Sequence, residues 1–172
     1  VATTAQTSAD QIAWAHSQLS VIEADPSFRG GDYYESETGP HVGLSIARQI
    51  AHTTYRSAYE LATRFGQGAQ DHEDPWKGGR YAVQSYLEHQ GTKFVKRFDA
   101  GSYKALTKAF MAHDLGRGRG GVREALSRIT AETLVVAVDT DRLCLPAEAE
   151  LIAAAVPGTG KVEWVTSHSG HD

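Results

Sequence analysis

Apolar residues recur at helical spacing through most of the chain. Ser8 and Gln11 form the sequence pattern of a capping box, which predicts the start of a first helix. Pro40 precedes a longer pattern of the same period, which predicts one continuous helix from about Val42 to Phe65. The polar segment Gln67–Gly79 then interrupts the pattern and is interpreted as a loop.

Three shorter helices are predicted in the region that follows. Each is indicated by a capping residue, a terminating glycine or an apolar face. They are Arg80–His89 ended by Gly91, a helix capped by Asp99 or Ser102, and Arg123–Ile129. Residues 1–8 are interpreted as the end of a core strand and a loop, so residues 9–128 would form one large helical region.

The pattern changes after residue 128. Thr133–Val138 is a continuous apolar and β-branched run, as in a buried parallel strand. Pro146–Val156 is rich in Ala, Glu and Leu and predicts a helix, and Lys161–Thr166 predicts a second strand. These segments form one βαβ unit within residues 129–172. Two strands do not make a stable sheet, so we expect further strands from another half of the protein or from another chain.

Composition and charge exclude several classes of protein. Of the 172 residues, 41% are hydrophobic and 22% charged, as in a globular protein, and the net charge of −4 does not suggest a nucleic-acid partner. No apolar run approaches 18 residues, and the first ten residues lack the pattern of a signal peptide. A single cysteine, Cys144, excludes an internal disulfide and agrees with a reducing, cytoplasmic location. The missing initiator Met and the abrupt end at Asp172 suggest that both ends are cuts.

Chemically active side chains follow both predicted strands. Asp139 and Asp141 come directly after the first strand, and His168 and His171 follow the second. Functional groups of parallel α/β sheets sit beyond the C-terminal ends of strands, and an Asp followed by a His is the order found in α/β-hydrolases. In such a pair the His moves a proton and the Asp fixes its tautomer. Polar loops after strands are common, so this pair alone is a weak signal.

A wider set of motifs makes the interpretation more specific. The chain resembles the homoserine O-acetyltransferases, a family with the α/β-hydrolase fold, through motifs that span nearly its whole length in the family's order. They are 5–8, 25–26, 30–33, 43–44, 47–48, 54–57, 64–65, 86–87, 89–91, 97–99, 102–103, 113–114, 116–121, 140–143 and 170–172. The resemblance implies a fragment of an α/β-hydrolase fold: the C-terminal strands of the parallel sheet, preceded by a large inserted helical lid (residues 9–128).

The resemblance also implies which residues are catalytic. Asp141 would be the triad aspartate rather than Asp139, and His171 the triad base rather than His168. The nucleophilic serine of the family lies in a Gly-x-Ser-x-Gly-like elbow upstream of the first motif, and no such elbow occurs here. The nucleophile and oxyanion hole would therefore belong to an N-terminal half that is absent from this chain.

Three further residues match substrate contacts of the family. Arg48 would bind the carboxylate of L-homoserine, Tyr55 would line the same pocket, and Asp172 would hold the substrate's ammonium group. Arg48 and Tyr55 are seven residues apart, two turns of a helix, and so share one face. Acetyl-CoA would be the co-substrate of a ping-pong reaction without metal or permanent cofactor, and the lid would mediate a homodimer.

Other interpretations stay open at this stage. A helical Arg48 is by default a surface residue, and Tyr55 a half-buried core aromatic. The enzyme could use a succinyl donor, or could be an esterase of the same fold that transfers the acyl group to water. The chain could also be a non-catalytic fragment that acts as an interaction module. The segment Gly116–Gly121 fits G-x-G-x-x-G, but it follows a helix instead of a strand and does not indicate a dinucleotide site.

Overall fold

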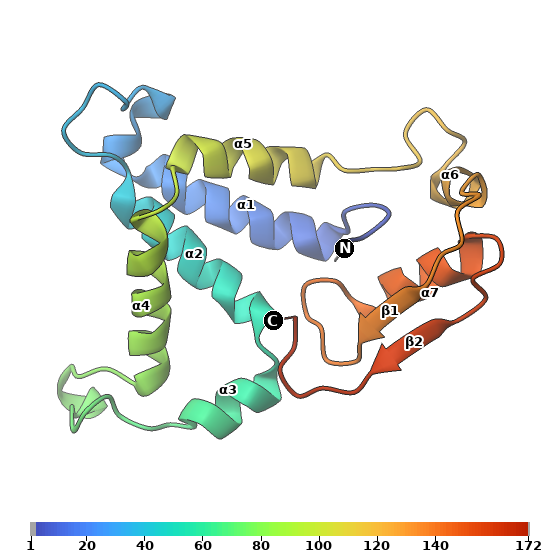
Figure 1. Cartoon of the computed structure of the whole chain (residues 1–172). Helices are drawn as coiled ribbons and strands as arrows, with labels where there is room; N and C mark the ends of the chain where they lie inside the picture. The colour runs from blue at the N-terminus through green and yellow to red at the C-terminus, as the bar shows by residue number, and fades with distance from the viewer. Residues whose placement is uncertain (1–2, 172) are drawn as a thin grey trace.

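The computed structural model describes residues 3–171. Its elements follow the predicted change from helices to a βαβ unit (Figure 1). They are α1 (Ala9–Ala24), η1 (Pro26–Gly31), α2 (His41–Tyr55), α3 (Ala58–Phe65), η2 (Pro75–Lys77), α4 (Ala82–Val95), α5 (Ala100–Met111), α6 (Val122–Ser127), β1 (Val135–Val138), α7 (Pro146–Ala155) and β2 (Val162–Val165). None of these helices is long and apolar enough to cross a membrane.

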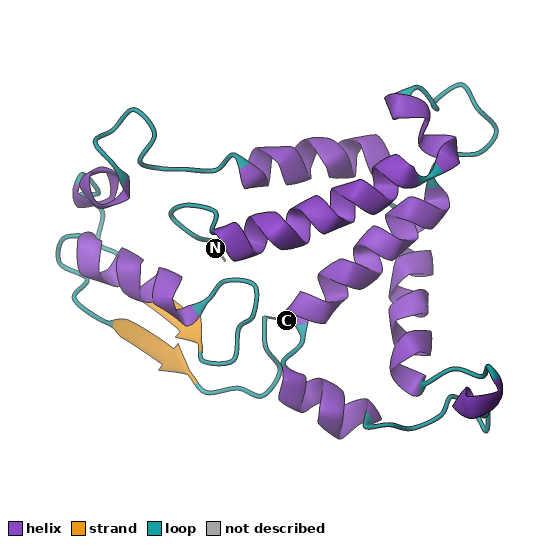
Figure 2. Ribbon diagram, turned by 180° about the vertical axis from the view of Figure 1, so that it is seen from behind, coloured by secondary structure: helices purple, strands orange, loops and turns teal. Residues whose placement is uncertain are grey.

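The helical region is built around α1 and α2. Helix α1 packs against α2 and α5, and α2 packs against α4 (Figures 1 and 2). Gly43 permits the close crossing, because a Cβ at that position would lie 2.6 Å from the carbonyl oxygen of Val21. Ser8 caps α1 in the predicted capping box with Gln11. The core of this region is formed by Ile22, Phe28, Tyr33, Leu44, Ala47, Phe94 and Ala100.

The prediction of one helix from Val42 to Phe65 is wrong. The chain leaves the helix after Tyr55, since Arg56 and Ser57 have extended backbone, and Ser57 then caps α3 by accepting a hydrogen bond from the Glu60 amide at 3.0 Å. Arg56 forms an antiparallel bridge with Gly170, at the far end of the sequence. A long-range pairing therefore interrupts a helix that local periodicity predicts as continuous.

The predicted end of α4 at Gly91 is also wrong, because the helix continues to Val95. Gly91 faces α2, where a Cβ would lie 2.7 Å from the carbonyl oxygen of Ser45. The glycine therefore permits close packing of two helices and does not end one. The loop predicted over Gln67–Gly79 is largely confirmed, with the short turn η2 inside it.

The C-terminal region contains the expected parallel strand pair. β1 and β2 pair in parallel with Val135 opposite Val162, and α7 packs against β1. Side chains of both strands remain exposed, including Val136 at 53% and Trp164 at 45%. Over residues 3–7 the structure shows no strand, only an isolated bridge from Gln6 to Asp114, so the expectation of a strand end is not met there.

Candidate active site

The loops after β1 and β2 bring Asp141 and His171 together. His171 Nδ1 lies 2.8 Å from Asp141 Oδ2, and the two side chains are 19% and 10% exposed. The parallel pairing of β1 and β2 places both loops at one end of the sheet, as the sequence predicts. Asp139 links the same loops by accepting a hydrogen bond from the Ser167 amide at 3.1 Å. His168 instead packs against Tyr59, with ring centroids 4.2 Å apart and the ring planes tilted by 30°.

The carboxylate of Asp141 is held by the backbone of its own loop. Its Oδ1 accepts hydrogen bonds from the amides of Leu143 at 2.7 Å and Cys144 at 2.9 Å. The other carboxylate oxygen, Oδ2, accepts a hydrogen bond from the His171 imidazole. When His171 donates from Nδ1, its Nε2 is the ring nitrogen that can accept a proton. This is the arrangement required of a general base oriented by a carboxylate.

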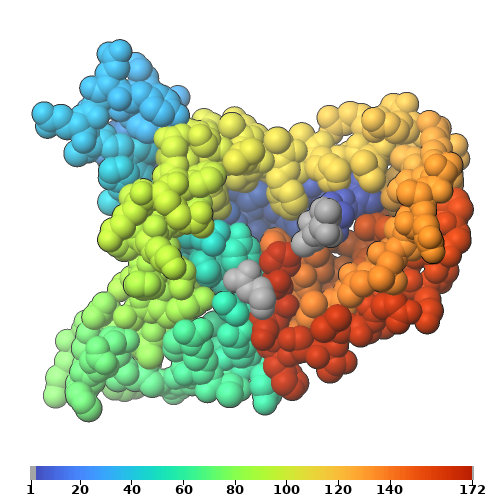
Figure 3. All heavy atoms as spheres, viewed as in Figure 1, coloured from blue at the N-terminus to red at the C-terminus, as the bar shows by residue number. Residues whose placement is uncertain are grey.

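The backbone of His171 is held by the end of α2. Its amide donates to the carbonyl oxygen of Tyr55 at 2.9 Å, and the two rings lie 5.8 Å apart between centroids. Figure 3 shows the C-terminal segment, in red, lying against the blue-green end of α2 and start of α3. The candidate base therefore sits at the junction between the helical region and the βαβ unit.

Arg48 and Tyr55 lie on one face of α2, as their spacing predicts. Arg48 Nη1 donates to the Tyr55 hydroxyl at 3.2 Å. The guanidinium carbon lies 5.0 Å from the centroid of the Tyr55 ring and 4.7 Å from that of Phe94, so two aromatic rings hold it by cation–π contacts. Within residues 3–171 no acidic side chain forms an ion pair with Arg48. Among the described residues, this half-buried guanidinium is thus held by a hydroxyl and two aromatic rings and by no carboxylate.

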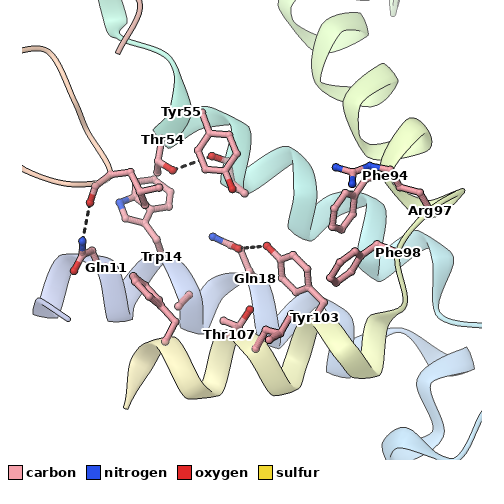
Figure 4. Close-up of a pocket in the computed structure, with 15 residues that line it drawn as sticks. Gln11, Trp14, Gln18, Thr54, Tyr55, Phe94, Arg97, Phe98, Tyr103 and Thr107 are labelled. Carbon is pink, nitrogen blue, oxygen red and sulfur yellow. Dashed lines mark hydrogen bonds between the residues drawn. The ribbon is translucent and has the colours of Figure 1, made fainter. Parts of the chain in front are cut away.

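A cavity of about 400 Å³ lies between Tyr55 and the Asp141 loop, and Arg48 is not among its lining residues. Tyr55 and Leu143 both line it, and Figure 4 shows Trp14, Phe94 and Tyr103 among its aromatic walls. A neighbouring hollow of about 360 Å³ is lined by His171 and shares Leu143 with the first. The two spaces therefore flank the Asp141 loop, one bordered by Tyr55 and the other by His171.

Gln11 binds the loop that carries Asp141, a role that the sequence did not predict. Its side-chain amide donates to the carbonyl oxygen of Leu143 at 2.7 Å and to Glu148 Oε2 at 3.2 Å (Figure 4 shows the Gln11 contact). Sequence patterns assign Gln11 only to a capping box, which it also forms. The contact that ties α1 to the Asp141 loop spans 132 positions and leaves no local signal.

Cys144 lies beside the pair, and its thiol, one oxygen of Asp141 and one nitrogen of His171 lie within 4.8 Å of one another. Burial, and then the charges of Asp141 and Glu148, raise the pKa of the thiol to about 11. A protonated thiol is a poor metal ligand, and Asp141 already accepts three hydrogen bonds. The donor set thus fits proton transfer better than metal binding. Asp172, the expected ammonium contact, lies outside the described residues.

Comparisons with known proteins agree with the fold and the motifs. No protein-family profile matches the chain. A homoserine O-acetyltransferase of Thermobifida fusca is 52% identical over 173 aligned positions, which cover 100% of this chain and 46% of the relative. The crystal structure of the homoserine O-acetyltransferase of Bacillus anthracis superposes with a TM-score of 0.85 at 22% identity, covering 98% of this chain and 46% of that one. Esterase E22 superposes with a TM-score of 0.81 at 18% identity, covering 98% and 47%.

The chain thus spans about half the length of the curated relatives that it matches, 46% of the Thermobifida protein and 43% of a homoserine O-acetyltransferase of Mycobacterium avium. The identity to these relatives, 52% and 49%, extends over 100% and 98% of this chain. The solved structures identify the fold, and one of them is an α/β hydrolase enzyme from a deep-sea metagenome library. The chain is therefore homologous over its whole length to part of the homoserine O-acetyltransferases, and it has the corresponding part of the α/β-hydrolase fold.

Proposed function

We propose that the protein containing this chain is an acyltransferase that moves an acetyl group from acetyl-CoA to the hydroxyl of L-homoserine. The observation that carries the proposal is the position of Tyr55. Its carbonyl oxygen binds the backbone of His171, while its hydroxyl binds Arg48. The Asp141–His171 pair and a guanidinium that forms no ion pair among the described residues are thus joined through one residue, as a substrate with both a hydroxyl and a carboxylate requires.

The proposed reaction has two half-reactions. In the first, a serine from a part of the protein that precedes this chain attacks the thioester carbonyl as His171 Nε2 accepts its proton. The C–S bond breaks, the thiolate of coenzyme A takes that proton from the imidazolium, and an acyl-serine remains. Asp141 keeps the imidazole in the required tautomer and stabilises its charged form. No step in this scheme needs a metal or a permanent cofactor.

In the second half-reaction homoserine is the acceptor. Arg48 binds its carboxylate through two charge-assisted hydrogen bonds, and Asp172 binds its ammonium group. His171 removes the proton of the substrate hydroxyl, which attacks the acyl-serine. The serine leaves with the proton from the imidazolium, and O-acetyl-homoserine is released. A guanidinium that forms no ion pair within residues 3–171 favours an amino-acid acceptor over water, because hydrolysis requires no carboxylate clamp.

The test is a thiol-release assay on the protein that carries this chain together with the part that precedes it. Release of free thiol from acetyl-CoA should depend on added L-homoserine, and O-acetyl-homoserine should form in equal amount. Equal thiol release without homoserine would identify a hydrolase of the same fold. Succinyl-CoA in place of acetyl-CoA separates the two acyl donors, and release only with succinyl-CoA would replace the acetyl donor by the succinyl one.

A further inference from the structure

The junction between α2 and α3 forms a continuous contact with the loop that carries His171. Ser57 donates a hydrogen bond from its hydroxyl to the carbonyl oxygen of His168, and from its amide to the carbonyl oxygen of Ser169 at 3.3 Å. One residue earlier, Arg56 bridges Gly170. Tyr55, the residue before Arg56, completes the contact, because its carbonyl oxygen accepts the hydrogen bond from the His171 amide. Three consecutive residues of α2–α3 thus hold four consecutive residues of the catalytic loop.

Ser57 contacts the loop through its side-chain hydroxyl as well as through its backbone. It is 4% exposed, and its oxygen also accepts from the Glu60 amide, so donor and acceptor functions of the hydroxyl are both used. The carbonyl oxygen of His168 lies three residues before the catalytic imidazole. By binding this carbonyl, the Ser57 hydroxyl holds the first residue of the turn that runs through Gly170. This turn places the His171 imidazole next to Asp141.

We propose that Ser57 is a positioning residue for His171, which couples the start of α3 to the orientation of the catalytic imidazole. The proposal rests on the proposed function, because it assumes that His171 is the general base. Without the hydroxyl, the His168 carbonyl would lose its buried donor, and the loop could move away from Asp141. A displacement of about 1 Å in a catalytic group can lower a rate about 100-fold even when the change lies away from the reacting atoms.

The experiment uses the full-length protein and compares Ser57→Ala, Ser57→Thr and a matched control, Asp99→Ala. Asp99 caps α5 as Ser57 caps α3, but it contacts Tyr33 and Tyr34 and not the catalytic loop. We expect Ser57→Ala to lower kcat about 10- to 100-fold while KM for homoserine changes by less than about threefold. Ser57→Thr keeps a hydroxyl and should retain most of the kcat. Asp99→Ala should lower the melting temperature but leave kcat close to that of the wild type.

The outcomes separate this proposal from the proposed function. Hydrolysis of p-nitrophenyl acetate is measured beside acyl transfer, because it requires the imidazole but not homoserine. If the wild type cleaves the ester but never acylates homoserine, the acyltransferase proposal fails while the ester assay still tests Ser57. The positioning role is overturned if Ser57→Ala keeps the wild-type kcat, if Ser57→Thr loses as much as Ser57→Ala, or if Asp99→Ala lowers kcat to the same extent.

Discussion

His171 Nδ1 and Asp141 Oδ2 lie 2.8 Å apart across two loops that are separated by 30 positions in the sequence. Each loop follows one strand of the parallel pair, and each is fixed by hydrogen bonds to backbone groups. This contact is the part of the site that combines a proton acceptor with a group that orients it. It is also the contact whose removal gives the sharpest test of catalysis.

The first prediction concerns Asp141→Asn. An amide has nearly the shape of the carboxylate but can hold the imidazole in the wrong tautomer and cannot stabilise the imidazolium, so kcat should fall about 10³- to 10⁴-fold. Acyl transfer by the full-length protein is the measurement. Asp139→Asn is the matched control, because Asp139 links the two loops without contacting His171. An Asp141→Asn enzyme within tenfold of the wild type would exclude Asp141 from the triad.

The second prediction concerns Arg48→Lys. The lysine keeps the positive charge but loses the planar pair of donors and part of the contact with Tyr55 and Phe94. We expect KM for homoserine to rise about 13- to 160-fold, as the loss of about 1.5–3 kcal/mol of charge-assisted hydrogen bonding implies. Arg64→Lys is the control, since Arg64 stacks on Phe65 and Tyr86 by a similar contact on another helix. An equal rise of KM in both variants would contradict a substrate role of Arg48.

The third prediction separates the ring of Tyr55 from its hydroxyl. Tyr55→Phe removes only the hydrogen bond from Arg48, so kcat/KM for homoserine should fall by about 2- to 12-fold, equivalent to about 0.5–1.5 kcal/mol. Tyr55→Ala also removes the ring that packs against Arg48 and His171, and it should cost considerably more. Steady-state kinetics with homoserine as the varied substrate give both numbers. Equal effects of the two substitutions would show that only the hydroxyl matters.

Local signals reduced this site to a few candidate residues, and the resemblance to the homoserine O-acetyltransferases selected Asp141, His171 and Arg48 among them. Asp141 and His171 follow apolar runs typical of parallel strands, and Arg48 and Tyr55 share a helical face at a spacing of two turns. The positions that sequence analysis missed depend on distant partners. Gln11 binds the Asp141 loop and Ser57 the His171 loop, over separations of 132 and 111 positions. No local propensity encodes such contacts.

The same reason explains the errors in the fold. Periodicity extends without interruption across the α2–α3 junction, but the pairing of Arg56 with Gly170 requires extended backbone there. Gly91 carries the local signal of a helix end, yet it lies inside α4 because α2 packs closely against it. In both places a tertiary contact overrides the local preference. The predicted capping box at Ser8 is confirmed because all of its partners lie within one turn of helix.

The fourth prediction concerns the reactivity of Cys144. Burial is the main cause that raises the pKa of the thiol from 9.0 to about 11, so the thiol stays protonated at neutral pH. Alkylation by iodoacetamide should be slow at pH 7–9 and should reach half of its limiting rate only near pH 11, because the thiolate is the reacting form. A native thiol with a raised pKa binds its proton more tightly than the unfolded chain, so it lowers stability as pH rises from about 9 to 11. Mass spectrometry after timed alkylation, with the unfolded protein as control, measures the rate, and equal rates at pH 8 would contradict the prediction.

The last prediction concerns Gly170, which precedes the proposed general base His171. Its φ of +88° is strained for residues with a Cβ, and a Cβ there would lie 2.6 Å from the Ser57 amide nitrogen and 3.0 Å from the Tyr55 carbonyl oxygen. Gly158 has a similar φ of +80°, but nothing lies within 4 Å of the position that its Cβ would take. Comparing Gly170→Ala with Gly158→Ala therefore separates backbone strain from the clash.

Gly158→Ala should lower the melting temperature by about 2–8 °C, since left-handed strain costs about 1–2 kcal/mol, and should leave kcat unchanged. Gly170→Ala carries the same strain and must also push the loop away from the α2–α3 junction. We expect a larger loss of stability together with at least about a tenfold loss of kcat, because His171 moves with the loop. Thermal unfolding and acyl-transfer rates of the two full-length variants provide the comparison. If both variants keep the wild-type kcat, contact with the α2–α3 junction does not set the position of His171.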